Sequence, residues 1–126
     1  MPMNKRLWIK IAALSSLISV ALGAFAAHGL ESVLSDQRME VFQTAVKYQM
    51  FHSLALLAII SLQDDLLQLR WKILSLRCLL LGIVLFCGSL YLLVMTNISA
   101  FGMITPIGGT AFMIGWLSLC WAARKP

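Results

Sequence analysis

Long apolar stretches dominate the chain, and short segments that hold most of the charged residues separate them. A helix that crosses the hydrocarbon core of a bilayer needs about 20 mostly apolar residues, because the core is roughly 30 Å thick. Four stretches reach that length, at about 7–29, 43–62, 76–96 and 106–123. The pattern predicts an all-α membrane protein, an antiparallel bundle of four transmembrane helices that forms one integral-membrane domain over residues 1–126.

The second and fourth stretches carry signals for where their helices begin. The apolar half of the second stretch covers only 51–62, and it is too short to span a bilayer. We therefore expect this helix to begin earlier, at an N-cap on Ser35 or Asp36. The fourth stretch opens with Thr105-Pro106, which predicts a threonine N-cap followed by proline at the first helical position.

Small residues recur every three or four positions, which is typical of helices that pack closely in lipid. The first span holds two overlapping rows, which are Ala12, Ser16, Ser19, Gly23, Ala26 and Ser15, Ser19, Gly23, Ala27. The fourth holds Gly108, Ala111, Gly115, Ser118 and Ala122, and the third holds a shorter row of Ser75, Cys78, Gly82 and Ser89. We expect tight packing at these positions, so permeation would need an oligomer or an opening motion.

Composition narrows the possible classes of protein. Hydrophobic residues make up 60% of the chain and charged residues 12%, whereas a soluble domain has roughly 25% charged residues. This balance excludes a soluble enzyme fold and a disordered chain. The net charge of +5 does not indicate nucleic-acid binding, because the cations lie at the ends of the apolar stretches.

The distribution of these cations predicts the orientation. With four spans, eight fall on one side, which are Lys5, Arg6, Lys10, Arg70, Lys72, Arg77, Arg124 and Lys125, and two on the other, which are Arg38 and Lys47. Since Lys and Arg favour the cytoplasmic side, both termini should be cytoplasmic. Trp8, Trp71 and Trp121 then lie at the cytoplasmic interface, as in an aromatic belt.

A cleaved secretory signal is the alternative for the N-terminus. A basic start, an apolar stretch and Ala24-Phe25-Ala26 resemble such a signal with its cleavage site. However, the apolar stretch continues to Leu30 and carries the small-residue rows, so we favour a retained helix. A mature N-terminus near Ala27 or His28 would contradict the four-span topology.

Polar residues inside the spans are the candidate functional positions, because burying them in lipid is costly. His52 lies ten residues before Leu62, about 15 Å along the helix, and therefore near the midplane. The predicted cluster in the outer half comprises His52, Tyr48, Tyr91, His28 and Thr105. It could hold a small ligand, a metal or a proton relay. The structural alternative, which we favour, is that neutral His52 hydrogen-bonds to a neighbouring helix.

Metal binding and catalysis are the less favoured functions. Two histidines supply at most half of a tetrahedral metal site. A nucleophile needs a base and an orienting group within reach, and the sequence places no acid inside a span. We therefore expect no metal, no cofactor and no enzymatic activity.

Four motifs, in this order, resemble the YgdD/YwdK-like family of small bacterial inner-membrane proteins, a domain of unknown function. They are LGAFAAHGL at 22–30, FQTA at 42–45 with Tyr48, Gln49 and His52, FCGSLY at 86–91, and ITPIGG at 104–109 with Gly115-Trp116. The resemblance covers nearly the whole chain. It implies a multi-pass protein of the bacterial cytoplasmic membrane and a retained first helix, and it supplies no activity or site residue.

These observations lead to two functional hypotheses. The first is a non-enzymatic membrane component whose polar outer half binds a partner or a small ligand. The alternative is an oligomeric proton or small-solute permeation protein, with His52, Tyr48 and Tyr91 along the path. The expected partners are the lipid bilayer, further copies of the chain and an unknown small ligand, without nucleic acid.

Overall fold

The computed structural model describes residues 3–124, and this part of the chain is helical without strands. In chain order its elements are α1 (Lys5–His28), α2 (Asp36–Ser61), α3 (Leu69–Gly82), the π-helix η1 (Ile83–Cys87), α4 (Gly88–Thr96), the 3-10 helix η2 (Ser99–Met103) and α5 (Thr105–Ala122). Because α3, η1 and α4 follow one another without a break, they form one long rod, here called the α3–α4 rod.

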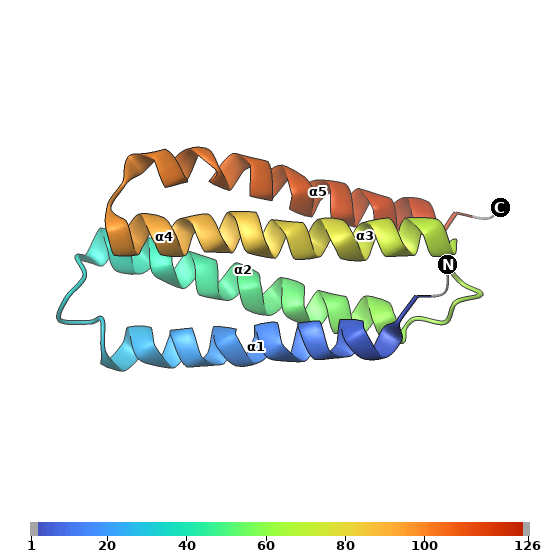
Figure 1. The fold of residues 1–126 in the computed structure, drawn as a ribbon, viewed down its shortest axis with the longest axis horizontal. Helices are drawn as coiled ribbons and strands as arrows, with labels where there is room; N and C mark the ends of the chain where they lie inside the picture. Colours follow the sequence, from blue (N-terminus) through green and yellow to red (C-terminus); the bar gives the residue numbers. More distant parts are fainter. Residues whose placement is uncertain (1–2, 125–126) are drawn as a thin grey trace.

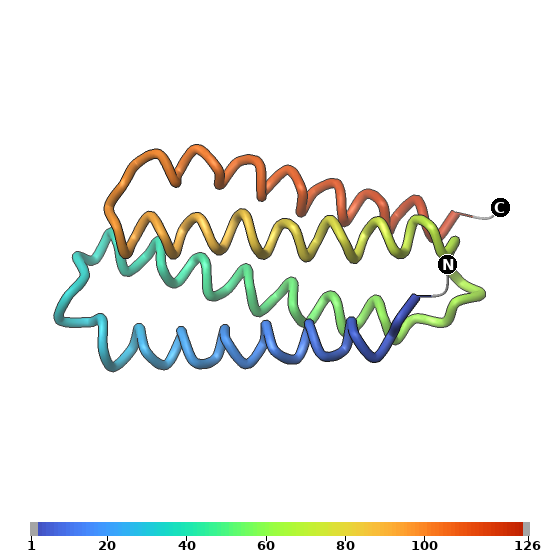
Figure 2. Tube along the Cα trace, viewed as in Figure 1, coloured from blue at the N-terminus to red at the C-terminus, as the bar shows by residue number. Residues whose placement is uncertain are grey.

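Four rods lie side by side, and consecutive rods are joined at alternate ends of the molecule (Figures 1 and 2). The beginning of α1 and the end of α5 lie at the same end, together with the loop between α2 and α3 (Figure 1). This end, here called the terminal end, holds the described members of the larger cation group. Lys125, which was counted in that group, lies outside the described residues.

The ends of the helices follow local capping chemistry. Ser35 is the N-cap of α2, as predicted, and its hydroxyl accepts a hydrogen bond from the Arg38 backbone N–H at 3.3 Å. The predicted cap of α5 was wrong, because Ile104 takes the N-cap position and Thr105 is the first helical residue. The Thr105 hydroxyl instead lies 2.6 Å from the Ser89 hydroxyl on α4, so it joins two rods.

Three helical stretches are long and apolar enough to cross a membrane, which are Lys5–His28, Leu69–Thr96 and Ser99–Ala122. The remaining rod, α2, has a lower mean hydropathy because it carries polar residues such as Gln43, Lys47 and Gln49. The described structure therefore combines three strongly apolar rods with one that is more polar.

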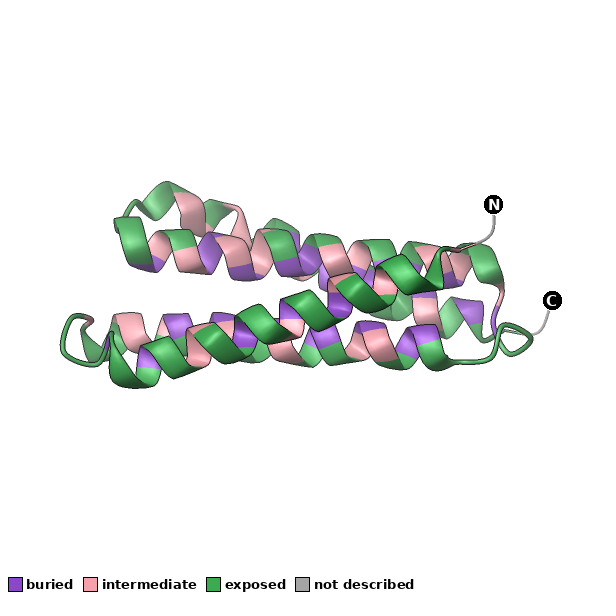
Figure 3. Ribbon diagram, turned by 60° about the horizontal axis from the view of Figure 1, so that its bottom comes forward, coloured by how far each residue is buried: buried purple, intermediate pink, exposed green. Residues whose placement is uncertain are grey.

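The rods pair in the order α1, α2, α3–α4 rod and α5, so α1 and α5 are the outermost helices (Figure 1). The most extensive contacts join α1 to α2 and α5 to α3 and η1, while α2 also packs along the α3–α4 rod. Residues 3–124 contain no comparable pairing of α1 with α5. Buried residues lie on the inner faces of the rods, whereas the residues of the outer faces are exposed (Figure 3) and many of them are large and apolar. Such surfaces fit a lipid environment.

The small-residue row of α5 lies in the packed interface, as predicted. Gly108, Ala111, Gly115, Ser118 and Ala122 are all buried. A Cβ atom on Gly108 would lie only 2.2 Å from the backbone nitrogen of Phe86, and one on Gly115 would lie 2.7 Å from the Leu79 side chain. The backbones of α5 and η1 therefore touch at Gly108, which is the close approach that small residues permit.

The contact face of α1 follows the first predicted row, with Ser16 half-buried, and departs from the second row at Ala27. It buries Ala12, Ser15, Ser19 and Ala26, with Gly23 half-buried and 3.4 Å from Val46 when a Cβ is added. Ala27 is exposed, and the Ser16 hydroxyl donates to the carbonyl of Ala12 in its own helix. The second row fails at Ala27 for a geometric reason, since each step of four residues overshoots a full turn by about 40° and a row of such steps rotates off the interface.

The third span is not the uniform α-helix that its sequence predicts, because η1 forms a π-helical turn between Gly82 and Gly88. Such wide turns are rare and often lie at functional sites. Here the turn places the Phe86 backbone against Gly108, and it orients the Phe86 ring toward α2, with its centroid 4.7 Å from the Tyr48 ring.

Candidate functional site

His52 is buried on α2 and makes contacts with α5. Its Nδ1 lies 2.8 Å from the Tyr48 carbonyl oxygen one turn earlier, and its Nε2 lies 3.1 Å from the indole Nε1 of Trp116. The imidazole also stacks on the Phe112 ring, with centroids 3.7 Å apart and an interplanar angle of 21°. Phe112 and Trp116, one turn apart on α5, thus hold the ring on its face and at its edge.

These contacts determine the tautomer of His52. The indole N–H is only a donor, so Nε2 must accept with its lone pair, and the proton must then be on Nδ1, where it is donated to the Tyr48 carbonyl. In a doubly protonated imidazolium, Nε2 would also carry a proton, and its N–H would point at the indole N–H of Trp116. The arrangement therefore fits neutral His52, and it leaves neither ring nitrogen free to ligate a metal.

A groove lies beside this pair of helices. It has a volume of about 590 Å³ and opens between α2, η1 and α5, and we call it the lateral groove. Its lining includes Tyr48, His52, Phe86, Gly109, Phe112 and Trp116. The outer parts of Tyr48 and Trp116 are exposed, so the groove opens sideways, toward the position that lipid occupies around a spanning protein. The Tyr48 hydroxyl makes no hydrogen bond within residues 3–124.

A second polar group lies on a neighbouring face of α2, about 100° around the helix, and joins three helices. The Gln49 side-chain amide donates to the Ser15 carbonyl on α1 at 3.1 Å, and its oxygen accepts from the Tyr91 hydroxyl on α4 at 2.6 Å. The Ser53 hydroxyl donates to the Gln49 carbonyl at 2.6 Å. Since that uses its proton, the Ser15 hydroxyl must donate to Ser53, 2.6 Å away. Every member of this inner network is thus satisfied.

The predicted five-residue cluster is divided in the structure. Tyr48 and His52 lie together in the lateral groove, with their ring centroids 5.9 Å apart. Tyr91 belongs to the inner network, Thr105 contacts Ser89, and His28 is exposed at the end of α1. Depth along a helix predicted that His52 lies near the midplane, Tyr48 and Tyr91 in the outer half, and His28 and Thr105 nearer the outer surface. It did not predict the rotation of each helix about its axis.

The five residues of the predicted cluster do not include Gln49, which joins three helices, or Trp116, which lines the groove. Gln49 follows Tyr48 directly, so its side chain points about 100° away around the helix and reaches α1 and α4 instead of α5. One signal was available, because Gln49 and Ser53 are spaced four residues apart and lie on one face, as do Ser15 and Ser19. Trp116 gave no such signal.

A third group of polar side chains lies at the terminal end and joins the helices there. Lys72, counted from the sequence as an interfacial cation, is fully buried, and its ammonium group donates to the Leu62 carbonyl and to Asp64, each at 2.9 Å. Lys5 of α1 also donates to Asp64 at 2.8 Å. Hydrogen bonds from Lys5 and Lys72 lower the pKa of Asp64 from its ordinary value of 3.8 to about 2. One carboxylate thus joins α1, α3 and the loop between α2 and α3.

The lateral groove is the candidate functional site, because the other groups of polar side chains make hydrogen bonds that join the helices to one another. Among residues 3–124, no three side chains of His, Cys, Asp or Glu lie close enough to hold a metal ion. The groove offers apolar and aromatic surface with one unused hydroxyl, an arrangement typical of binding sites for small apolar ligands.

Comparison with known proteins agrees with the motifs found in the sequence. A sequence model of a family described as "Protein of unknown function (DUF423)" matches residues 22–109, which run from the second half of α1 into α5. The chain belongs to this family. The match includes Tyr48, His52, Phe86 and Gly109 of the lateral groove, whereas Phe112 and Trp116 follow it.

Several relatives of this family are similar over most of their length. The chain is 42% identical to the UPF0382 membrane protein YwdK of Bacillus subtilis, with 95% of this chain and 98% of the relative covered. It is 43% identical to a UPF0382 membrane protein of Haemophilus influenzae, with 96% of each chain covered. It is 40% identical to the UPF0382 inner membrane protein YgdD of Escherichia coli, with 90% of this chain and 86% of the relative covered. No solved structure matches the chain.

Proposed function

We propose that the protein is a non-enzymatic, four-span component of the bacterial cytoplasmic membrane that binds a small lipid-soluble ligand in the lateral groove. The observation that carries this proposal is the groove itself. Its volume of about 590 Å³ lies within the range of roughly 300–1,000 Å³ that is usual for small-molecule sites. Its opening between α2 and α5 would admit a ligand from the lipid phase.

The groove indicates the chemistry of the ligand. His52 and Trp116 satisfy each other, so neither offers a free polar atom, and the ligand must be held mainly by contact with aromatic and aliphatic surface. The Tyr48 hydroxyl remains for one hydrogen bond. A flat or branched apolar molecule with a single polar group fits this lining.

Four spans with both termini in the cytoplasm have support from three features. The 26 residues of α2 rise about 39 Å, more than the hydrocarbon core requires, and the polar side chains around Gln49 are hydrogen-bonded inside the bundle. Ser15 and Ser19 of α1 hydrogen-bond to α2, which favours retention of the first helix. The larger group of cations gathers at the end where α1 begins and α5 ends.

Permeation by an oligomer has less support as an alternative. A proton or polar solute needs groups that can exchange hydrogen-bond partners along a path. The inner network of Ser15, Gln49, Ser53 and Tyr91 is closed on itself, and both His52 nitrogens are occupied. Self-association of the chain remains a separate proposal, with the exposed apolar faces of the helices as its possible surfaces.

A substitution that fills the groove tests the binding proposal. Gly109 lines the groove, and a Cβ there would lie 3.8 Å from the Phe86 ring, so Gly109→Leu should occupy the space without moving a helix. Gly88→Leu is the matched control, because a Cβ at Gly88 has no neighbour within 4 Å and Gly88 does not line this groove.

The probe is 1-aminoanthracene, a flat apolar molecule with one amine, added to the protein in lipid nanodiscs while its fluorescence is recorded. Partition into lipid gives a linear background that all variants share. We expect a saturable component in the wild type and in Gly88→Leu, and its loss in Gly109→Leu. The absence of a saturable component, or its persistence in Gly109→Leu, would refute the proposal.

A further inference from the structure

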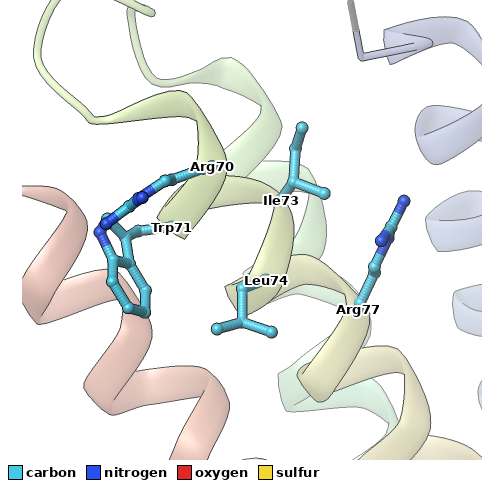
Figure 4. Close-up of a pocket in the computed structure, with 5 residues that line it drawn as sticks. All are labelled: Arg70, Trp71, Ile73, Leu74 and Arg77. Carbon is cyan, nitrogen blue, oxygen red and sulfur yellow. The ribbon is translucent and has the colours of Figure 1, made fainter. Parts of the chain in front are cut away.

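One face of α3 combines two arginines with exposed apolar residues near the terminal end. A pocket of about 400 Å³ is lined there by Arg70, Trp71, Ile73, Leu74 and Arg77. Figure 4 shows that the Arg70 and Trp71 side chains point toward α5, whereas the Arg77 side chain points toward α1. The two arginines therefore flank an apolar floor, and their positions along the helix differ by about 10 Å.

A second pocket adjoins the first on the α1 side. It has a volume of about 350 Å³ and shares Ile73 and Arg77 with the first pocket. Its other walls are mainly apolar and include Leu7 and Trp8 of α1 and Leu80 of α3. Arg77 thus stands between two apolar pockets.

The same face of α3 stays apolar and open toward the middle of the molecule. Leu81 and Val84 follow Arg77 at steps of four and three and are 49% and 59% exposed. A Cβ on Gly88, one turn further, would meet nothing within 4 Å. The face therefore continues for several turns along the exposed side of the α3–α4 rod.

The positive charge of this face is not compensated by the protein. Neither Arg70 nor Arg77 has a carboxylate within 4.0 Å in the part of the chain that the structure describes. Asp64, in the adjoining loop, is already bound by Lys5 and Lys72. Contact between this face and the same face of a second copy would bring like charges together, whereas an anionic ligand would neutralise them.

We propose that this face is a binding site for an anionic phospholipid. The phosphate lies over the apolar floor, at a level between Arg70 and Arg77 where both positive charges attract it, and the acyl chains occupy the two pockets and extend over Leu81 and Val84. Basic pockets at the membrane interface bind anionic headgroups in this way. Because the two apolar pockets share Arg77, they match a lipid that has one anionic headgroup and two acyl chains. This site is separate from the lateral groove, so either proposal can fail without the other.

The test is native mass spectrometry of the purified protein in detergent, titrated with phosphatidylglycerol, cardiolipin and phosphatidylethanolamine. The variant is Arg70→Gln/Arg77→Gln. Arg6→Gln/Lys10→Gln is the matched control, because it removes two exposed cations from the same end outside both pockets. Melting curves recorded without lipid show whether each variant is folded.

We expect the wild type and the Arg6→Gln/Lys10→Gln control to bind both anionic lipids in preference to phosphatidylethanolamine. Each pocket arginine should contribute about fivefold to the affinity, so the pocket variant should bind about 25-fold more weakly with an unchanged melting temperature. Lysophosphatidylglycerol, which has one chain, should bind more weakly than the two-chain lipid.

Three results would overturn the proposal. One is equal loss of binding in the control, which would mean a response to net charge alone. Another is equal binding of phosphatidylethanolamine. The third is a disulfide-linked dimer of Leu74→Cys that forms whether or not anionic lipid is present, because a second copy would then cover this face.

Discussion

The contact between α5 and η1 at Gly108 provides a sharp test of how the rods pack. Gly108→Ala adds one methyl group where a Cβ would lie 2.2 Å from the Phe86 nitrogen, 2.7 Å from the Phe86 Cα and 2.8 Å from the Leu85 carbonyl carbon. These are backbone atoms of η1, so no side-chain rotation relieves the overlap. The helices must separate by about 1 Å to reach ordinary contact at 3.4 Å.

The expected cost follows from this overlap. Inserting a methyl group into a well-packed interface destabilises a protein by about 1–3 kcal/mol. Replacing glycine by alanine in a helix is itself stabilising by up to about 1 kcal/mol. Gly109→Ala is the control for this gain in helix propensity. Gly109 is the next residue of the same helix, and its added Cβ would have ordinary contacts at 3.8 and 3.9 Å. The difference between the two variants should therefore be about 1–3 kcal/mol.

The assay is equilibrium unfolding of both variants and the wild type in the same mixed detergent, with helical circular dichroism as the signal. We expect Gly109→Ala to be as stable as the wild type or slightly more stable, and Gly108→Ala to be the least stable. Equal stability of Gly108→Ala and Gly109→Ala would refute the close backbone contact and with it the π-helical geometry that places Phe86 there.

Three further outcomes follow from the polar groups. Trp116→Phe removes the indole donor to the buried imidazole and should lower the unfolding free energy by about 1 kcal/mol in the same assay. Tyr91→Phe leaves the Gln49 side-chain oxygen unpaired and should cost about 1–2 kcal/mol, whereas Tyr48→Phe, which removes a hydroxyl without a partner, should leave the melting temperature unchanged. The carboxylate of Asp64 stabilises the folded state because its folded pKa of about 2 lies below its ordinary 3.8. The stability advantage of the wild type over Asp64→Asn should therefore be complete above about pH 4 and disappear as the pH falls through about 2; an advantage unchanged at pH 2 would contradict the ion pairs.

The sequence by itself determined the helices, their approximate ends and the packed face of α5. Hydrophobic length, the Ser35 N-cap and the spacing from Gly108 to Ala122 are local properties, because each depends on residues within a few turns of one helix. The family motifs could be recognised for the same reason. These predictions did not require knowledge of which helices are neighbours.

Only the tertiary structure decided what each polar side chain contacts. Tyr48 and Gln49 are adjacent in sequence, yet one lies in the lateral groove and the other joins α1 to α4. Lys72 and Arg77 were both predicted to be cytoplasmic cations. Lys72 is buried and bound to Asp64, whereas Arg77 lines two pockets and has no carboxylate partner among the described residues. The reason is that the rotation of each helix about its axis depends on all of its packing contacts together. Those contacts join residues that are far apart in the sequence, so the local pattern of one helix does not reveal them.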